Sequence, residues 1–188
     1  MSTTTDARDL CVAPHPSRSV QDFFVRIGCV QHNRAVKAMK DTVRIRRATL
    51  RDLPLLLRYR RAMAEEMDGA DEAAVNRMIA ALEPYLRAAI PEDRWHSWIA
   101  EPGGCGSVEI VPWVPGRLDP TPRRAWIHSV YVEPSFRRRG IGRQLTQTII
   151  AWCRERGFEW IYLHASDQGR PLYESLGFVP SSEMRLKL

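Results

Sequence analysis

From residue 43 onward, apolar and polar positions alternate with the periods of strands and helices. Val43-Arg-Ile-Arg alternates as a half-buried strand does. Thr49 and Asp52 are residue types that favour the N-terminal cap of a helix, so we expect a helix to follow them. A second helix is predicted after the Gly69-Ala-Asp71 break, and Pro91 ends it. Its apolar side chains form one continuous stripe, which predicts packing against a core: Val75, Met78, Ile79, Leu82, Tyr85, Leu86 and Ala89.

The middle of the chain predicts three strands. Trp95 to Glu101 and Gly106 to Val114 are separated by Pro102-Gly103-Gly104, which is the pattern of a hairpin. After a Pro-rich loop, Ala125 to Glu133 is predicted to form the third strand. Strict alternation would place Ile127, Ser129 and Tyr131 on one of its faces. The other face would carry Trp126, His128, Val130 and Val132.

The last third of the chain predicts a helix, a strand, a short helix and an extended end. The first helix runs from about Ile141 to Arg156, with Gly157 as its C-terminal cap. Its inward side chains would be Ile141, Leu145, Ile149, Trp152 and Cys153. Phe158 to His164 is predicted to be a strand buried on both faces, Gly169 to Leu176 a short helix, and Phe178 to Leu188 an extended end. This order of elements predicts the α+β class, with a mixed sheet covered by helices.

Residues 1–41 differ from the rest of the chain. They begin with a polar stretch rich in turn-forming residues, among them Pro14 and Pro16, and no packed face can be assigned to them. We therefore predict a flexible N-terminal extension over residues 1–41 and one domain over residues 42–188. With 188 residues and 44% apolar content, the chain is long enough to bury one sizeable core.

Charge and cysteine content narrow the classes of partner and compartment. The net charge is +6 and the isoelectric point about 9.5, which is compatible with nucleic acid or a phosphorylated cofactor as partner. The four cysteines form no CxxC pair and the histidines show no ligand spacing, so we predict free, buried thiols and no metal. No apolar run approaches the ~20 residues that span a bilayer, and no signal region opens the chain. We therefore expect a cytoplasmic protein with no membrane partner.

Arginine and glycine are concentrated between the third predicted strand of the middle region and the helix after it. The segment contains Arg137, Arg138, Arg139, Gly140, Ile141, Gly142 and Arg143. The first amides of a helix lack internal partners and its dipole favours anions, so phosphate oxygens would bind there. The glycines remove side chains that would hold a pyrophosphate away from the backbone. A surface turn with solvated arginines is the alternative.

The spacing of the glycines narrows the kind of phosphate ligand. Leu145 stands where a dinucleotide fingerprint needs its third glycine, and no Gly-Lys-Ser/Thr follows as in a P-loop. Arg137-Arg-Arg-Gly140-Ile-Gly142 instead matches the Arg/Gln-x-x-Gly-x-Gly/Ala signature of the GNAT superfamily of N-acetyltransferases. Val130-Tyr-Val132-Glu-Pro134 resembles the strand before that signature. Leu163-His164-Ala165-Ser166 and Pro171-Leu-Tyr173-Glu-Ser-Leu-Gly177-Phe178 resemble the second half of the family. The resemblance covers residues 43–188, in order.

The resemblance implies a fold and a co-substrate. The fold would be a central mixed, mostly antiparallel sheet with a splayed parallel strand pair, flanked by about four helices. The co-substrate would be acetyl-CoA, with its pantetheine arm paired to backbone groups of Val130, Tyr131 and Val132. Its pyrophosphate would be held by the segment from Arg137 to Arg143. His164 and Ser166 would touch the pantetheine or the acceptor, and His164 departs from the Asn that family members often carry there.

Two side chains are candidates for moving protons. Tyr173 matches the family's general acid beside the coenzyme sulfur, although a phenol that only packs its helix against the sheet would fit the same position. His128 is the candidate general base, because it precedes Val130 by two residues and a reference pKa near ~6.5 suits neutral pH. A packed His128, Glu109 on the adjacent predicted strand and a water chain are alternatives, and the identity of the base stays open.

The predicted activity is transfer of an acetyl group from acetyl-CoA to a primary amine of a small molecule or peptide, by direct attack on the thioester. Two alternatives stay open: a non-catalytic module that binds or senses acyl-CoA, and an acetyltransferase for an RNA-linked or protein amine. Nucleic acid is the less favoured partner, and the family implies a homodimer as a candidate state. Five acidic residues near the joint of the first two helices would attract a cationic acceptor or form a solvated helix end: Glu65, Glu66, Asp68, Asp71 and Glu72.

Overall fold

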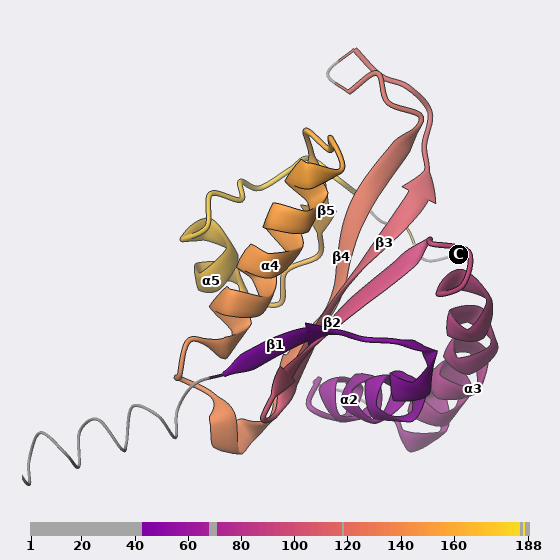
Figure 1. Ribbon diagram of the computed structural model, residues 1–188, viewed down its shortest axis with the longest axis vertical. Helices are drawn as coiled ribbons and strands as arrows, with labels where there is room; N and C mark the ends of the chain where they lie inside the picture. Colours follow the sequence, from indigo (N-terminus) through magenta and orange to yellow (C-terminus); the bar gives the residue numbers. More distant parts are fainter. Residues whose placement is uncertain (1–42, 68–70, 118, 185, 187–188) are drawn as a thin grey trace, which may run out of the picture. The chain divides into compact units, whose positions relative to one another are not determined.

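A five-stranded sheet in the order β1-β2-β3-β4-β5 forms the centre of the computed structural model (Figure 1). Its strands are β1 (Arg44–Arg47), β2 (Trp95–Glu101), β3 (Gly104–Pro112), β4 (Arg123–Val132) and β5 (Ile161–Leu163). Neighbouring strands are antiparallel except β4 and β5, which pair in parallel. The structure describes residues 43–67, 71–117, 119–184 and 186. The predicted extension over residues 1–41 lies outside these residues and stays a prediction.

Four α-helices in this part of the chain cover the two faces of the sheet. α2 (Leu53–Glu65) and α3 (Glu72–Ala89) lie on one side of it in Figure 1, and α4 (Ile141–Glu155) and α5 (Arg170–Glu174) lie on the other. Two 3-10 turns, η1 (Leu50–Asp52) and η2 (Pro134–Phe136), precede α2 and follow β4. The predicted class is confirmed: a mixed, mostly antiparallel sheet with one parallel pair, flanked by four helices.

α4 supplies most of the core on its side of the sheet. Its buried side chains follow helical spacing, as predicted, and pack against the sheet: Ile141, Leu145, Ile149 and Cys153. Gly157 follows the last turn with a left-handed backbone (φ +75°), which suits a C-terminal cap. Full burial of a Leu or Ile side chain contributes roughly 1.5–3 kcal/mol. These contacts therefore hold the start of α4 in a fixed place beside β4.

The opposite face is packed by α2 and α3. Asp71 caps the start of α3, since its carboxylate accepts hydrogen bonds from two amides of the first turn at 3.1 and 3.2 Å. Within the predicted stripe of α3, Val75, Leu86 and Ala89 are buried, whereas Tyr85 is 38% exposed. The stripe is therefore core along much of its length, and Tyr85 reaches the surface.

The cysteines that the structure describes are free thiols. Cys105 and Cys153 are both buried, as predicted. Burial raises the pKa of each thiol to about 12, because the thiolate would lose its hydration. Cys11 and Cys29 lie outside the described residues.

β4 contains a β-bulge. The pairing of Cys105 with Tyr131 and of Ser107 with His128 leaves two residues of β4 opposite one residue of β3. Ser129, one of these two, has a left-handed backbone with φ +54°. A bulge adds one residue to one strand, so the alternation of side chains shifts by one position beyond it.

The bulge overturns the predicted faces of β4. Ile127, before the bulge, and Val130 and Val132, after it, all pack with the core beneath α4. His128 points to the other side, where its ring stacks on Trp95 in the core beneath α3. The prediction that His128 shares a face with Val130 and Val132 is therefore wrong, because strict alternation does not continue through a bulge.

The C-terminal part of the sheet is smaller than predicted. β5 is half-buried rather than buried on both faces, because it is an edge strand that pairs with β4 alone. The short helix covers Arg170–Glu174 within the predicted range. The described residues after Phe178 form no strand, so this part of the predicted extended end adds nothing to the sheet. Val179 and Met184 are 78% and 92% exposed, so these side chains do not hold the segment against the sheet.

Candidate active site

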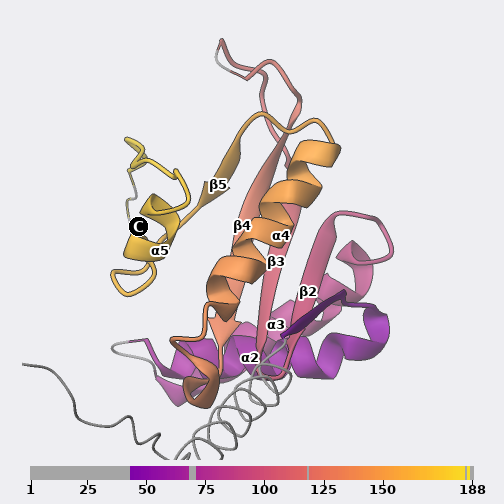
Figure 2. The same cartoon turned by 60° about the vertical axis from the view of Figure 1, so that its left-hand side comes forward.

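β4 and β5 separate where their pairing ends. The last pair joins Ile127 to Leu163, and β4 continues beyond it to Val132. Figure 2 shows β5 running away from β4 toward α5. Among the described residues, no strand pairs with this edge of β4 beyond Ile127. Val130, Tyr131 and Val132, which were predicted to pair with pantetheine, therefore lie on an edge whose backbone groups need other partners.

The start of α4 lies beside this edge. Gly140 caps the helix with φ +77° and no side chain caps its first turn. The amide of Gln144 donates to the carbonyl of Gly140 at 3.0 Å, so the amides of Ile141, Gly142 and Arg143 have no intrahelical acceptor. A Cβ atom added at Gly140 would have one heavy atom within 4 Å, Nε2 of Gln144 at 4.0 Å. The backbone here is open to an anion.

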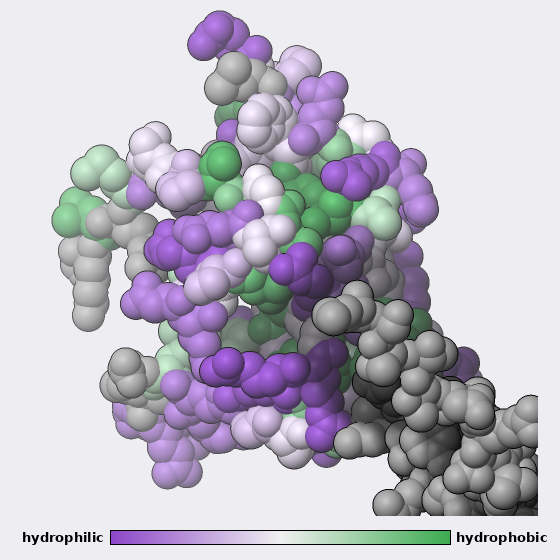
Figure 3. Space-filling view, turned by 90° about the vertical axis from the view of Figure 1, so that its left-hand side faces the viewer, coloured by the Kyte–Doolittle hydropathy of each residue, from purple (hydrophilic) through white to green (hydrophobic). Residues whose placement is uncertain are grey.

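The four predicted arginines have different partners. Arg137 donates from Nε to the carbonyl of Val132 at 2.8 Å, and its guanidinium also pairs with Glu66. Arg139 donates to the carbonyl of Ser135 at 3.2 Å. Arg143 is exposed and donates to the hydroxyl of Ser175, just after α5, at 2.6 Å. Arg138 is exposed in the loop before α4, where its backbone has φ +62°. Hydrophilic residues dominate the side of the molecule on which α4 and α5 lie, and apolar residues show between them (Figure 3).

Tyr173 lies on α5, next to the start of α4. A Cβ atom added at Gly142 would meet Leu172 at 3.4 Å, which shows how closely the two helices pack. The Tyr173 ring meets Phe178 edge-on at 5.8 Å between centroids, so part of its role is packing. Its hydroxyl has no hydrogen-bond partner among the described residues. Burial raises the pKa of Tyr173 above its ordinary value, so the phenol stays protonated at neutral pH.

His128 lies on the other face of β4, among polar and aromatic side chains. Its ring stacks on Trp95 with centroids 5.3 Å apart, and its Nε2 lies 3.4 Å from Oε2 of Glu109. The other oxygen of Glu109 accepts a hydrogen bond from Tyr85. Burial and then the charge of Arg60 lower the pKa of His128 to about 4, so its imidazole is neutral at pH 7. Burial raises the pKa of Glu109.

This arrangement around His128 was not predicted from the sequence. Tyr85 was predicted to belong to a core stripe, and Trp95 was predicted only as part of a strand. β2, β3 and β4 bring Trp95, Glu109 and Trp126 into one cross-strand row. Tyr85 reaches this row from α3, where it bonds Glu109 and meets Trp95 edge-on. Cross-strand register cannot be read from one strand alone.

The two other predicted contact residues follow β5. His164 is exposed, its ring lies 5.1 Å from that of Trp126, and its Nε2 is 3.4 Å from a carboxylate oxygen of Glu183. The hydroxyl of Ser166 accepts a hydrogen bond from the amide of Gly169 at 3.2 Å, just before α5. Ser166 therefore shapes the turn into α5, whereas His164 faces the same aromatic surface as Trp126.

Several carboxylates of the predicted acidic cluster are already engaged. Glu66 accepts a hydrogen bond from Tyr131 at 3.0 Å and pairs with Arg137. Glu65 lies 3.6 Å from the guanidinium of Arg61. Asp71 caps α3, and Asp68 lies outside the described residues. These contacts leave less negative charge to attract a cationic acceptor than the sequence suggested.

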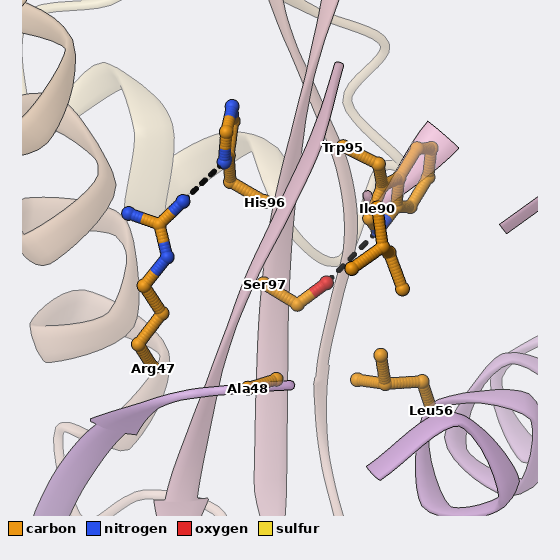
Figure 4. A pocket seen from close by; sticks show the side chains of 7 residues that line it. All are labelled: Arg47, Ala48, Leu56, Ile90, Trp95, His96 and Ser97. Atoms are coloured by element: carbon orange, nitrogen blue, oxygen red, sulfur yellow. Dashed lines mark hydrogen bonds between the residues drawn. The ribbon is translucent and has the colours of Figure 1, made fainter. Parts of the chain in front are cut away.

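A separate pocket lies where β1 leaves β2 (Figure 4). Arg47 and His96 lie on one side of β2 in this view, and Trp95 and Ser97 lie on the other. Arg47 bonds Nδ1 of His96, and the indole of Trp95 donates to Ser97 at 2.9 Å. Nε2 of His96 is buried without a hydrogen-bond partner among the described residues, and burial lowers the pKa of this ring to about 4. In the sheet, β3 separates β2 from β4. We therefore place the candidate site at the splay of β4 and β5.

The described residues contain no group of three or more His, Cys, Asp or Glu side chains that could hold a metal ion. In the same residues, no helix combines the length and the apolar character needed to cross a membrane.

Known proteins share this fold. The model of the Acetyltransferase (GNAT) family matches residues 61–178. A GCN5-related N-acetyltransferase from Ralstonia eutropha JMP134 is 30% identical with a TM-score of 0.74, over 78% of this chain and 99% of its own. A predicted acetyltransferase from Clostridium acetobutylicum, crystallised with acetyl-CoA, is 25% identical with a TM-score of 0.68. The match covers 78% of this chain and 96% of that one. Because the family model spans more than half of the chain, the chain belongs to the GNAT family of acetyltransferases.

Curated relatives match over shorter stretches. The glucosamine 6-phosphate N-acetyltransferase of Trypanosoma brucei brucei is 36% identical over 63 residues, which are 33% of this chain and 43% of the relative. The chain thus spans less than half the length of such curated relatives. The family resemblance that the sequence motifs predicted is confirmed.

Proposed function

We propose that the chain is an N-acetyltransferase, which transfers the acetyl group of acetyl-CoA to a primary amine of a small molecule or peptide by direct attack on the thioester. The observation that carries this proposal is the start of α4, where three amides without an intrahelical acceptor follow Gly140 beside the unpaired edge of β4. Amides and a helix dipole in this arrangement attract the charge of a pyrophosphate. Membership of the GNAT family supports acetyl-CoA as the co-substrate.

The residues around the splay fit acetyl-CoA in charge and in space. Gly140 leaves its backbone uncovered, and Arg138 and Arg143 are exposed close to it. Arg137 already occupies the carbonyl of Val132. Pairing of the pantetheine arm with β4 would therefore use Val130 first, or would require Arg137 to turn away. Acetyl-CoA supplies the activated acetyl group. The chain binds and orients the two substrates, and its side chains move the protons.

His128 is proposed to accept the proton of the attacking amine. When Nε2–H donates to Glu109, Nδ1 carries the free lone pair of the neutral ring. Tyr85 holds the other oxygen of Glu109 and so fixes the carboxylate that orients His128. Tyr173 is proposed to give its proton to the leaving thiolate, since burial keeps its phenol protonated.

Release of free coenzyme A from acetyl-CoA, measured across a panel of amines, tests this function. Tyr173→Phe should lower kcat roughly a hundredfold with the best acceptor, because general acid catalysis is lost. Its acetyl-CoA affinity should stay unchanged. Tyr59→Phe is the control, because Tyr59 lies on the buried face of α2 in the core. An unchanged kcat for Tyr173→Phe would remove Tyr173 from the mechanism. Tight coenzyme binding without transfer to any amine would favour the alternative of a sensing module.

A further inference from the structure

Arg60 holds a partly buried positive charge without an acidic partner among the described residues. It projects from α2 toward β4, and its guanidinium lies 3.4 Å from the hydroxyl of Ser129. Other arginines of the same helix have carboxylates: Arg58 pairs with Glu133 at 3.1 Å and Arg61 with Glu65 at 3.6 Å. Arg60 is thus the exception on a helix whose neighbouring arginines are paired.

An unpaired guanidinium in this place is costly to the folded chain. A buried cation loses hydration, and a counter-ion is the usual compensation. Burial lowers the pKa of Arg60, because the charged guanidinium loses hydration. Arginine remains charged at neutral pH, so an anion that reached Arg60 would gain both charge neutralisation and paired hydrogen bonds.

Arg60 lines a narrow, mostly apolar pocket next to the candidate reaction centre, with a volume of about 10 Å³. This is room for about one water, so an anion that binds Arg60 would have to displace neighbouring side chains. The pocket lies between α2, α3 and the sheet, and its polar groups come from Arg60, Ser107 and Ser129. Ser129 is the bulge residue directly after His128, at the step where β4 turns from the α3 side to the splayed edge. Trp95, on which His128 stacks, lines the same pocket.

We propose that Arg60 binds an anionic group, a carboxylate or a phosphate, carried by the amine acceptor. This inference rests on the proposed acetyltransferase function and specifies the class of its second substrate. The acidic cluster suggested a cationic acceptor, whereas Arg60 favours an acceptor that carries an anionic group. Two carboxylates of that cluster are already in structural contacts, Glu66 with Arg137 and Asp71 at the start of α3. An acceptor held by its anion at Arg60 would present its amine near His128.

Matched acceptor pairs test the proposal. β-Alanine is compared with β-alaninamide for the carboxylate, and O-phosphoethanolamine with ethanolamine for the phosphate. We expect the anionic member of one pair to have a kcat/KM about ten- to a hundredfold higher, because a charge-assisted pair is made at Arg60. The pair that shows the preference identifies the anion. Equal transfer to both members of both pairs would overturn this inference and leave the proposed function standing.

Variants connect the preference to Arg60. Arg60→Gln should bring the ratio within each pair close to one, whereas Arg60→Lys should retain part of it. Arg58→Gln, two residues away on the exposed side of α2, should keep the wild-type ratio. A ratio that Arg60→Gln leaves unchanged would overturn the proposal.

Binding gives a readout that does not need turnover. O-Phosphoethanolamine or β-alanine should raise the melting temperature of the wild type and not that of Arg60→Gln. If such binding were seen with no transfer to any amine, the proposed acetyl transfer would fail while the anion site stood. Absence of both protection and preference would overturn the anion site.

Discussion

At the residue scale, His128 and Tyr173 differ in what surrounds their titratable groups. His128 is partly buried near Arg60 and His164, and both the burial and these neighbours favour the neutral imidazole. Tyr173 is partly buried, its hydroxyl has no hydrogen-bond partner in the described part of the chain, and burial favours the neutral phenol. The neutral imidazole has a lone pair that can accept a proton, and the neutral phenol has a proton to donate. Both pKa values are displaced away from neutral pH, which makes His128 a weaker base and Tyr173 a weaker acid than the reference groups.

The pH dependence of the reaction should reflect the low pKa of His128. Its pKa is lowered from 6.5 to about 4, so the base form is complete above about pH 5 and is lost only as pH falls toward 4. We therefore expect kcat/KM to show no inflection near 6.5, and its acid limb to follow the pKa of the acceptor amine. Profiles from pH 5 to 9 with two acceptors of different pKa check this.

His128→Gln provides the companion measurement. It should lower kcat roughly a hundredfold if the imidazole is the base. An inflection near 6.5 that is the same for both acceptors, and that disappears in His128→Gln, would contradict the low pKa. If the substitution left the rate unchanged, Glu109 or a water chain would be the general base instead of His128.

Some residues of the candidate site could be predicted from the sequence and others could not. Gly140 and its arginines are local features, because a helix start is determined by a few consecutive residues. The surroundings of His128 depend on how α3, β2 and β3 pack around β4, so Tyr85 and Trp95 were missed. Arg60 was missed for the same reason, since its unpaired state appears only when α2 is packed on β4.

At the scale of elements, the strands and helices were predicted well and the departure from regular geometry was not. Periodicity located α4 and both hairpin strands within a few residues. The bulge could not be predicted from β4, because it depends on Gly106 of the neighbouring strand, opposite Ser129 and Val130. The extended end predicted after Phe178 forms no strand among the described residues, because apolar residues alone do not ensure strand pairing.

The close approach of β3 and β4 near the hairpin predicts a sensitive position. A Cβ atom at Gly104 would lie 2.9 Å from the carbonyl oxygen of Tyr131, a backbone atom that cannot move independently. Gly104→Ala should therefore lower the free energy of unfolding by about 1–3 kcal/mol. Gly116→Ala is the control, since its Cβ would meet an atom only at 3.8 Å. Urea unfolding measures both, and equal midpoints for the two variants would argue against tight packing at Gly104.

At the scale of the whole domain, the proposed coenzyme and acceptor groups lie on different sides of the sheet. The start of α4 and Tyr173 of α5 lie on one side, and His128 and Arg60 lie on the side of α2 and α3. The bulge in β4 connects the two sides, since it turns His128 and Val130 in different directions. This arrangement explains how a coenzyme and an acceptor could approach one strand from different faces.

Titration of the purified protein with acetyl-CoA in a calorimeter tests the central claim most directly. The free amides after Gly140 should bind the pyrophosphate, so the wild type should release or absorb heat and gain thermal stability with ligand. Gly140→Asp should lose this binding, because it places bulk and negative charge at the helix start. Gly157→Asp, at the other end of α4 with a similar φ of +75°, should bind as the wild type does. No heat and no protection in the wild type, or full affinity in Gly140→Asp, would contradict the account.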